Sequence, residues 1–450
     1  MKAFDRIRKR LGDFWWYTLL HFAATRSGDL INAFIGLWLV PKFVSSEELG
    51  AVLPLTQFAA VLALPVSVFG MAFMKYVNVL AAEGRKGEMK SLLRGVFMAA
   101  AALAVLAVVV ARFTMAPVLE RLRIEKGMLG VLIIAAGFLG AVAPVYTNAL
   151  QALKRFRELS LLAALGAPIR LVVMLVTMPI RALSGYFTGQ SSVCLWQIAC
   201  SVFALRRELG ADVKSVPFWT RTNTLSFVRY SFFVTLYHLP ALALFAEALI
   251  IRQRLPSVDS AGYYMISKFA EIGTYAGASL MAILFPYASE TAQKGGDTNR
   301  MLLRTMWAAM IFGGLCAAGF AVTGRWLLPW LPGGEAYAPY VPQLVVLTVV
   351  LTMFTALNCV ITGEVAAGRF GFLKWSVPVH LIYIGVLFGI SGHGYFRAWL
   401  PEGAFAALAR LNACGLNWLL GAMLMLQAVK LIFVLCDITR RKSLRQKVVD

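Results

Sequence analysis

The stretch GVFMAAAALAVLAVVVARFTMAP (95–117) is almost entirely apolar, with Arg112 as its one charged residue. A helix that crosses a bilayer needs about 20 mostly apolar residues, so this stretch predicts a membrane-spanning helix. Comparable stretches lie at about 14–40, 50–74, 128–150, 159–181, 185–205, 225–250, 261–288, 303–328, 339–363, 371–391 and 404–436. The sequence therefore predicts an all-α polytopic membrane protein with about twelve transmembrane helices.

The composition supports the same fold class. Of the 450 residues, 60% are hydrophobic and 14% are charged, whereas soluble domains have about 45–50% apolar and about 25% charged residues. Helices of about 20 residues leave only short loops in such a chain, which excludes a soluble enzyme and a large domain outside the membrane. We expect the basic segment MKAFDRIRKR to lead into a retained first helix, since no signal-peptide cleavage site is evident after it.

The sequence lacks the motifs of metal, disulfide and nucleotide chemistry. Its six cysteines lie in or beside apolar stretches and form no CxxC pair, so neither a zinc site nor a disulfide framework is indicated. No GxxxxGK[ST] loop is present, so ATP is not expected to be the direct energy source. We therefore expect no metal, no cofactor and no enzymatic activity.

Positive charge is unevenly distributed along the chain. The formal net charge is +21, which in a soluble protein would suggest nucleic acid but here is first a topological signal. If the N-terminus is inside, Lys and Arg are concentrated on the cytoplasmic side, at the N-terminus and at 75–94, 154–157, 206–229, 294–304, 369–374 and 430–447. The positive-inside rule then predicts that both termini are cytoplasmic, and no nucleic-acid partner is expected.

The two halves of the chain match at a nearly constant spacing. Matched pairs separated by 210 or 212 residues include Gly50 with Gly262, Ser67 with Ser279, Phe73 with Phe285 and Pro168 with Pro378. Six helices per half is an even number, so the halves would share one orientation, and parallel-repeat transporters bind substrate between their halves. We predict two six-helix lobes, residues 1–221 and 222–450, related by a parallel pseudo-repeat.

Four segments resemble a known family of transporters. They are LVPKFVSSEELGAVLPL (39–55), NALQALKRFRELSLL (148–162), LLPWLPGGEAYAPYVPQLVVL (327–347) and EVAAGRFGFLKW (364–375). These segments are similar to the O-antigen type polysaccharide flippases of the multidrug/oligosaccharidyl-lipid/polysaccharide exporter (MOP) superfamily. The resemblance implies a MATE-like fold of two six-helix lobes. It also implies export of a lipid-linked oligosaccharide across the bacterial inner membrane for polysaccharide biosynthesis, among membrane lipids and alongside polysaccharide polymerase or assembly proteins. Lipid II flippases of the superfamily usually have fourteen helices, so about twelve argues against a peptidoglycan precursor.

Charged residues inside the predicted helices are the candidate site residues, because each costs about 2.5–3.5 kcal/mol to insert and usually faces a cavity or a partner. Arg26 and Asp29 lie in the first helix, where His21, Thr25, Asp29 and Asn32 form a polar stripe. One interpretation is an ion pair that fixes helix packing, and the other is that Arg26 faces a water-filled cavity.

The remaining candidates lie in five further predicted helices. Lys268 and Glu271 are spaced to neutralise each other, whereas Arg170 has no acidic neighbour in sequence. When the two halves are aligned by the repeat, Arg26 matches His238 and Arg170 matches His380. One hypothesis is a cavity that is permanently cationic on one lobe and pH-dependent on the other. The alternative is that the histidines are ordinary packing residues. The predicted substrate-binding residues are Arg26, Asp29, Arg170, His238, Lys268 and His380, and the predicted coupling residues are Glu247, Glu271 and Glu364.

This set suits a polyprenyl diphosphate, since Arg binds phosphate groups bidentately and Lys and protonated His supply positive charge. The favoured hypothesis is therefore a flippase that moves a polyprenyl-diphosphate-linked oligosaccharide by alternating access. A multidrug or cation antiporter of the same fold is the first alternative, and an acidic cavity would favour it. A membrane glycosyltransferase or polymerase is the second, but the acidic residues expected on the outer side are scattered over short loops: Glu47, Glu48, Asp259, Glu335 and Glu402.

Overall fold

A computed structural model describes Trp16, Ala23, Gly403 and residues 25–121, 128–210, 213–294, 298–390 and 415–449. His21, which belongs to the predicted polar stripe, lies outside these residues, as does the start of the predicted helix 404–436. Every element in the described part of the chain is helical. The predicted all-α fold class is confirmed.

The first half begins with a helical segment, residues 25–34, which continues through the π-helix η1 (Ile35–Leu39) into the short α2 (Val40–Phe43). It is followed by α3 (Ser46–Ala82), α4 (Lys86–Arg121), α5 (Met128–Ala152) and α6 (Phe156–Glu208). Ser45 ends the turn after α2, because its hydroxyl accepts a 3.2 Å hydrogen bond from the Glu48 amide and donates one to the Glu48 carboxylate. This capping arrangement gives the SSEE sequence its structural role as the start of α3.

The long element α6 is a hairpin of two spans. Arg181 and Ala182 have non-helical backbone angles, and Ala182 has φ of 36°. The Thr177 hydroxyl donates to the Gly185 carbonyl at 3.2 Å. A Cβ atom on Gly189 would lie 2.4 Å from Met174 Cγ, so the two arms of the hairpin touch where glycine has no side chain. The predicted helices 159–181 and 185–205 are therefore separate spans that meet at this turn.

The second half contains two broken spans. They are α7 (Arg221–Tyr237) with α8 (Leu239–Arg254), and α9 (Ser257–Ala270) with the 3₁₀ helix η2 (Glu271–Thr274) and α10 (Tyr275–Gln293). Pro240 in the first turn of α8 lacks an amide donor, so the α-helical ladder ends at His238. The second span bends by 50° around η2. The sequence predicted both spans (225–250 and 261–288) but neither break.

The remaining elements are α11 (Asn299–Leu327), the 3₁₀ helices η3 (Leu328–Trp330) and η4 (Gly334–Tyr340), α12 (Val341–Ala366), α13 (Leu373–Ile390) and α15 (Leu416–Val449). Eight helical stretches of the described chain are long and apolar enough to cross a membrane, and the bent pair α9 and α10 is a ninth. The α6 hairpin turns one of them into two. With residues 25–43 and α13, the arrangement agrees with the predicted twelve helices.

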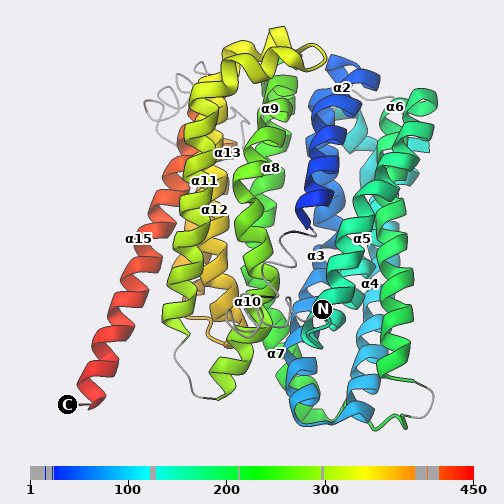
Figure 1. Cartoon of the computed structure of the whole chain (residues 1–450), viewed down its shortest axis with the longest axis vertical. Coiled ribbons are helices and arrows are strands. Elements are labelled where there is room, and N and C mark those ends of the chain that lie inside the picture. The colour runs from blue at the N-terminus through cyan, green and yellow to red at the C-terminus, as the bar shows by residue number, and fades with distance from the viewer. Residues whose placement is uncertain are drawn as a thin grey trace, which may run out of the picture.

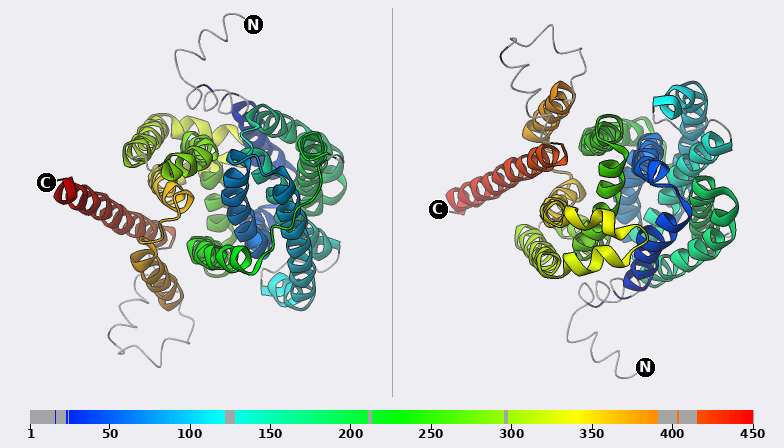
Figure 2. Two further views of the ribbon diagram at one scale, coloured as in Figure 1. Left: turned by 90° about the horizontal axis from the view of Figure 1, so that it is seen from below. Right: turned by 90° about the horizontal axis from the view of Figure 1, so that it is seen from above.

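The helices form two packed groups that meet along one side (Figure 1). In the first half, α3, α4, α5 and α6 pack on one another, and in the second half α8–α13 and α15 do so. The two groups touch where residues 25–43 and α3 contact α7–α10, a surface that we call the central interface. The end of α15 lies apart from the other helices in Figures 1 and 2. The pseudo-repeat and the lobe boundary at residues 221 and 222 stay predictions.

The two ends of the bundle differ in charge. The turns after α3, α5 and α12 and the linker after α6 lie at one end, which we call the basic end because Arg85, Lys154, Lys214 and Arg369 lie there. The turn after α2 and the helices η3 and η4 lie at the opposite end (Figure 1). Each end has its own buried apolar cluster, to which both halves contribute.

The cluster of the opposite end includes Leu49, Leu55, Met174, Phe187, Ile250, Tyr264 and Leu344. The cluster of the basic end includes Phe73, Leu92, Leu150, Phe227, Leu284, Leu302 and Cys359. Along α3, α6 and α9–α10 the chain passes from one cluster to the other. Arg170 lies between the two clusters in sequence, whereas Lys268 and Glu271 lie among residues of the cluster of the opposite end.

Candidate substrate-binding site

Arg26 joins the two halves of the molecule. Its guanidinium group forms a 2.8 Å ion pair with Asp29 and donates hydrogen bonds of 3.0 Å to the Tyr275 carbonyl and to the Ser279 hydroxyl of α10. The guanidinium carbon also lies 4.4 Å from the centre of the Tyr275 ring, a cation–π contact. Thr25 adds a 3.2 Å hydroxyl–hydroxyl contact with Ser279. The predicted pairing with Asp29 is present, and it occurs together with contacts across the central interface.

Lys268 and Glu271 form a second ion pair at the break between α9 and α10. The ammonium and carboxylate groups are 2.6 Å apart. Gly36 in the π-helix permits this placement, because its missing side chain leaves room for the Lys268 alkyl chain, whose Cδ would lie 3.0 Å from a Cβ there. The Tyr264 hydroxyl also donates to the Gly36 carbonyl at 3.2 Å. The first helix and α9 therefore approach each other closely. The π-helix η1 is also of interest because π-helical turns within α-helices are frequent at functional sites.

Arg170 differs from the other two basic residues because no carboxylate among the described residues pairs with it. Its guanidinium donates to the Asn32 side-chain oxygen at 3.2 Å and lies 5.2 Å from the centre of the Tyr186 ring. It lines a cavity of about 250 Å³ between the first helix and the two arms of α6. The other polar residues that line this cavity are Thr25, Asp29, Asn32, Gln190 and Gln197.

The three sets of contacts form one electrostatic network. Asp29 interacts with both Arg26 and Glu271, and Tyr186 lies within electrostatic range of both Arg170 and Lys268. Three basic and two acidic side chains leave one positive charge uncompensated, and Arg170 carries it. The arrangement can therefore bind an anion next to Arg170, with amide and hydroxyl groups supplying further hydrogen bonds.

The two candidate histidines lie apart from this network. His238 lies at the junction of α7 and α8, with its ring 5.0 Å from that of Tyr237, and it lines a mostly apolar cavity of about 460 Å³ with residues of α3 and α4. His380 in α13 is only 1% exposed and contacts the Ser376 carbonyl through Nδ1 at 2.7 Å. Neither histidine lines the cavity beside Arg170, so the structure does not bring the four repeat-related residues together.

Glu247 belongs to a separate buried group in the second half. It is 6% exposed and accepts a 2.5 Å hydrogen bond from the Tyr383 hydroxyl. It also interacts electrostatically with Lys430 of α15, which is fully buried and lies 5.1 Å from the centre of the Phe354 ring. The sequence-based assignment of Lys430 to the cytoplasmic charges is wrong, because Lys430 lies within the span Leu416–Thr439.

Glu364, the last coupling candidate, lies near the end of α12. It is 4% exposed, and its carboxylate is 3.5 Å from Arg369 Nε. The pair spans the turn after α12 at the basic end. Glu364 therefore has a basic partner, and it lies outside the network around Arg26.

Several members of the network are absent from the predicted site. Tyr186, Gln190, Tyr264, Tyr275 and Ser279 are uncharged, so the search for charged residues in apolar helices could not identify them. Ser279 did appear in the sequence as the repeat partner of Ser67. Asn32 was part of the polar stripe, and its contact with Arg170 links the first helix to α6.

These features define a multi-pass membrane protein whose two helical groups enclose a charged network at their interface. No protein-family model matches the sequence, and no curated protein matches it. The fold is that of the MATE transporters of the MOP superfamily. A Vibrio cholerae MATE transporter is 13% identical, with a TM-score of 0.67 over 99% of both chains.

Two further solved structures show the same fold at similar identity. An outward-facing multidrug resistance MATE family transporter of the MOP superfamily is 13% identical, with a TM-score of 0.67 over 97% of this chain and 98% of that one. A MOP superfamily transporter from Pyrococcus furiosus, described as having a binding pocket of reverse polarity, is 13% identical with a TM-score of 0.65 over the same shares. The similarity therefore extends over nearly the whole chain.

Proposed function

We propose that this protein is a transporter of an anionic amphiphile, and specifically a flippase for a polyprenyl-diphosphate-linked oligosaccharide in the bacterial inner membrane. Arg170 is the observation that carries the proposal. It lines the cavity between the first helix and the two arms of α6, has no carboxylate partner in the described chain, and is surrounded by hydrogen-bonding groups. Arginine with neighbouring amides is a suitable set of ligands for a diphosphate.

The size of the cavity supports a head-group site rather than a site for the whole substrate. Its volume of about 250 Å³ is below the ~300–1,000 Å³ of pockets for drug-sized ligands. A diphosphate can be held there, whereas an attached glycan needs the central interface to open. The basic end then faces the cytoplasm by the positive-inside rule, which places both termini on that side.

A multidrug or cation antiporter is the second candidate function. Asp29 lines the same cavity and Glu271 lies in the same network, and two structures with this fold are described as multidrug resistance transporters. Both carboxylates already pair with basic residues. A cationic drug would have to displace Arg26 or Lys268 and would meet Arg170, so the charge balance disfavours this function.

Ligand-induced thermal stabilisation of the purified protein tests the proposal, because a ligand that binds the folded state raises its stability. We expect a polyprenyl diphosphate oligosaccharide to raise the melting temperature and a cationic dye not to do so. Hydrogen bonds to charged groups contribute about 1.5–3 kcal/mol, so Arg170→Ala should weaken diphosphate binding about tenfold or more, and Arg170→Lys should weaken it less.

The matched control is Arg112→Ala, which removes an exposed arginine of α4. This variant should bind the diphosphate like the unmodified protein. Stabilisation by the dye alone would support the antiporter instead. Equal diphosphate binding by Arg170→Ala and Arg112→Ala would remove the arginine on which the proposal depends.

A further inference from the structure

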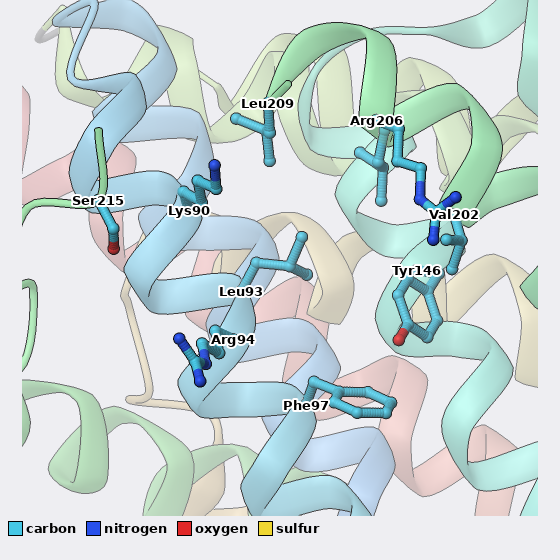
Figure 3. A pocket seen from close by; sticks show the side chains of 10 residues that line it. Lys90, Leu93, Arg94, Phe97, Tyr146, Val202, Arg206, Leu209 and Ser215 are labelled. Carbon is cyan, nitrogen blue, oxygen red and sulfur yellow. The ribbon is translucent and has the colours of Figure 1, made fainter. Parts of the chain in front are cut away.

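A further pocket lies at the basic end of the first half. Its volume is about 280 Å³, and it is formed by the start of α4, the end of α5, the end of α6 and the linker after α6 (Figure 3). Its lining consists of Lys90, Leu93, Arg94, Phe97, Tyr146, Val202, Leu205, Arg206, Leu209 and Ser215. No residue lines both this pocket and the cavity beside Arg170.

Basic side chains and an apolar side both line the pocket. Arg94 of α4 and Arg206 of α6 approach it from different helices (Figure 3). The rings of Phe97 and Tyr146, with centres 5.7 Å apart, form part of the apolar side, and Val202 lies beside them. Most of the lining is apolar, so a free anion would contact only part of this surface.

Lys90 has a different role from the two arginines. Its ammonium group donates to the Gly210 and Val213 carbonyls, at 2.9 and 3.0 Å. It therefore fixes the linker after α6 along the rim of the pocket. Arg94 and Arg206 are both exposed, and they are the side chains available to a ligand.

The surroundings of the pocket are those of a membrane surface. Met98 of α4 and Phe203 of α6, one helical turn further into the bundle, are each 63% exposed. Large exposed apolar surfaces of this kind mark contact with lipid in a membrane protein. At the basic end, the positive-inside rule places this region at the cytoplasmic leaflet, where anionic lipids give a negative surface potential.

We propose that this pocket binds an anionic phospholipid of the cytoplasmic leaflet, with the lipid phosphate between Arg94 and Arg206 and the upper acyl chain against Phe97, Tyr146 and Val202. Basic pockets between transmembrane helices are suited to such head groups. The ligand is a lipid rather than free phosphate because the apolar side of the pocket needs an apolar ligand to cover it.

The bound lipid would also act on the connection between the two halves. The linker from α6 to α7 is attached to α4 by hydrogen bonds from the Val216 amide to the Gly87 carbonyl at 3.1 Å and from the Phe218 amide to the Ser91 hydroxyl at 3.3 Å. Ser215 of this linker lines the pocket. A lipid in the pocket therefore adds contacts where the linker is held, and it should stabilise the folded protein.

The experiment measures lipid binding to the purified, delipidated full-length protein by native mass spectrometry and by thermal unfolding. The probes are phosphatidylglycerol, phosphatidylcholine and inorganic phosphate. The variant Arg94→Gln/Arg206→Gln is compared with a control of equal charge, Arg112→Gln/Arg207→Gln. Arg207 is a suitable control because it neighbours Arg206 but lies over the Phe203 ring, 5.3 Å from its centre, and does not line the pocket.

We expect phosphatidylglycerol to bind and stabilise the unmodified protein, and phosphatidylcholine and phosphate not to do so. A basic residue near an anionic lipid surface contributes about fivefold to binding, so the pocket variant should lose about twenty-five-fold in affinity and the control variant much less. Arg94→Lys/Arg206→Lys should retain most of the binding because it keeps the charge.

Three results would overturn the proposal. They are equal binding of phosphatidylglycerol and phosphatidylcholine, competition by inorganic phosphate at equal concentration, and equal losses in the pocket and control variants. The first two are measured on the unmodified protein, so the proposal can be rejected even if the glutamine variant does not fold.

Discussion

At the scale of single residues, Arg26 has contacts that serve two purposes at once. It neutralises Asp29, and it holds the first helix to α10 through Tyr275 and Ser279. A side chain that only neutralised Asp29 would need no partner in the second half. Because the side chains of Arg26 and Asp29 remain 20% and 24% exposed, a ligand that reached the central interface could replace some of these contacts.

A double-mutant cycle separates the structural role of Arg26 from a role in transport. Arg26→Ala leaves Asp29 partly buried without its cation, so it should destabilise the protein. Breaking a fully buried ion pair costs about 3–5 kcal/mol. Because this pair is partly exposed, we expect a loss of about 2 kcal/mol. Arg26→Ala/Asp29→Asn should recover the part of that loss that comes from the unpaired carboxylate, but not the part that comes from the hydrogen bonds to Tyr275 and Ser279. If Arg26 contacts the diphosphate, the double variant still fails to export glycan, and Arg26→Lys restores export only in part.

The measurements are the melting temperature of the purified variants and the surface glycan of cells that carry them at equal protein level. Asp29→Asn alone is the control for the loss of the carboxylate. Normal surface glycan in the double variant would show that Arg26 and Asp29 form only a structural pair.

At the scale of elements, the sequence predicted the spans but not their irregularities. Long apolar stretches reveal helices because the bilayer requires every backbone group to be paired within the helix. Pro240 accompanies the break at His238, but a proline alone does not reveal a break, because Pro144 and Pro286 lie inside continuous helices. The break at η2 and the π-turn at Ile35–Leu39 leave the apolar pattern unchanged. The same limit applied to the site. Spacing alone indicated the pairs Arg26–Asp29 and Lys268–Glu271, whereas the contacts of Arg170 with Asn32 and Tyr186 join helices that are distant in sequence.

The turn of the α6 hairpin provides a test at this scale. Ala182 has φ of 36°, which an L-residue with a Cβ adopts at a cost of about 1–3 kcal/mol. Ala182→Gly removes that strain. It also increases the conformational entropy of the unfolded chain, which lowers the stability of the folded protein by about 0.4–1 kcal/mol. We therefore expect Ala182→Gly to stabilise the protein by about 1 kcal/mol.

Thermal unfolding in one detergent and lipid mixture measures this difference. Ser184→Gly is the control, because Ser184 is helical and two residues away, and glycine within a helix should lower stability by about 0.5–1 kcal/mol. If both variants lowered the melting temperature alike, the turn at Ala182 would not be strained.

At the scale of the whole molecule, the central interface is closed at both ends. At the opposite end, the Ser260 hydroxyl of α9 donates to the Gly50 carbonyl of α3 at 3.2 Å. At the basic end, Lys154 forms an ion pair with Glu290 of α10, and the rings of Phe156 and Tyr287 stack with centres 6.5 Å apart. The apolar cluster of each end lies beside these contacts. The proposed transport by alternating access therefore requires the contacts at each end to open in turn.

The ion pair Lys154–Glu290 predicts how the basic end opens. Ion pairs with partly exposed partners contribute about 0.2–1 kcal/mol, so Lys154→Glu, which replaces attraction with repulsion, should shift the equilibrium toward a state open at the basic end about fivefold. A cysteine at Ser279 in a cysteine-free background lies at the central interface, where Ser279 is 2% exposed and contacts Arg26, and reports this opening. Its labelling by an impermeant thiol reagent in inverted vesicles should become about fivefold faster in Lys154→Glu, and Lys154→Glu/Glu290→Lys should return to the original rate.

Lys294→Glu is the matched control, because Lys294 pairs with the same carboxylate at 2.8 Å but lies at the end of α10 itself and does not join the two halves. The labelling rate of the reporter cysteine should stay unchanged in Lys294→Glu. Equal acceleration by Lys154→Glu and Lys294→Glu would mean that only charge at Glu290 matters, and that the contact between the halves does not hold the basic end closed.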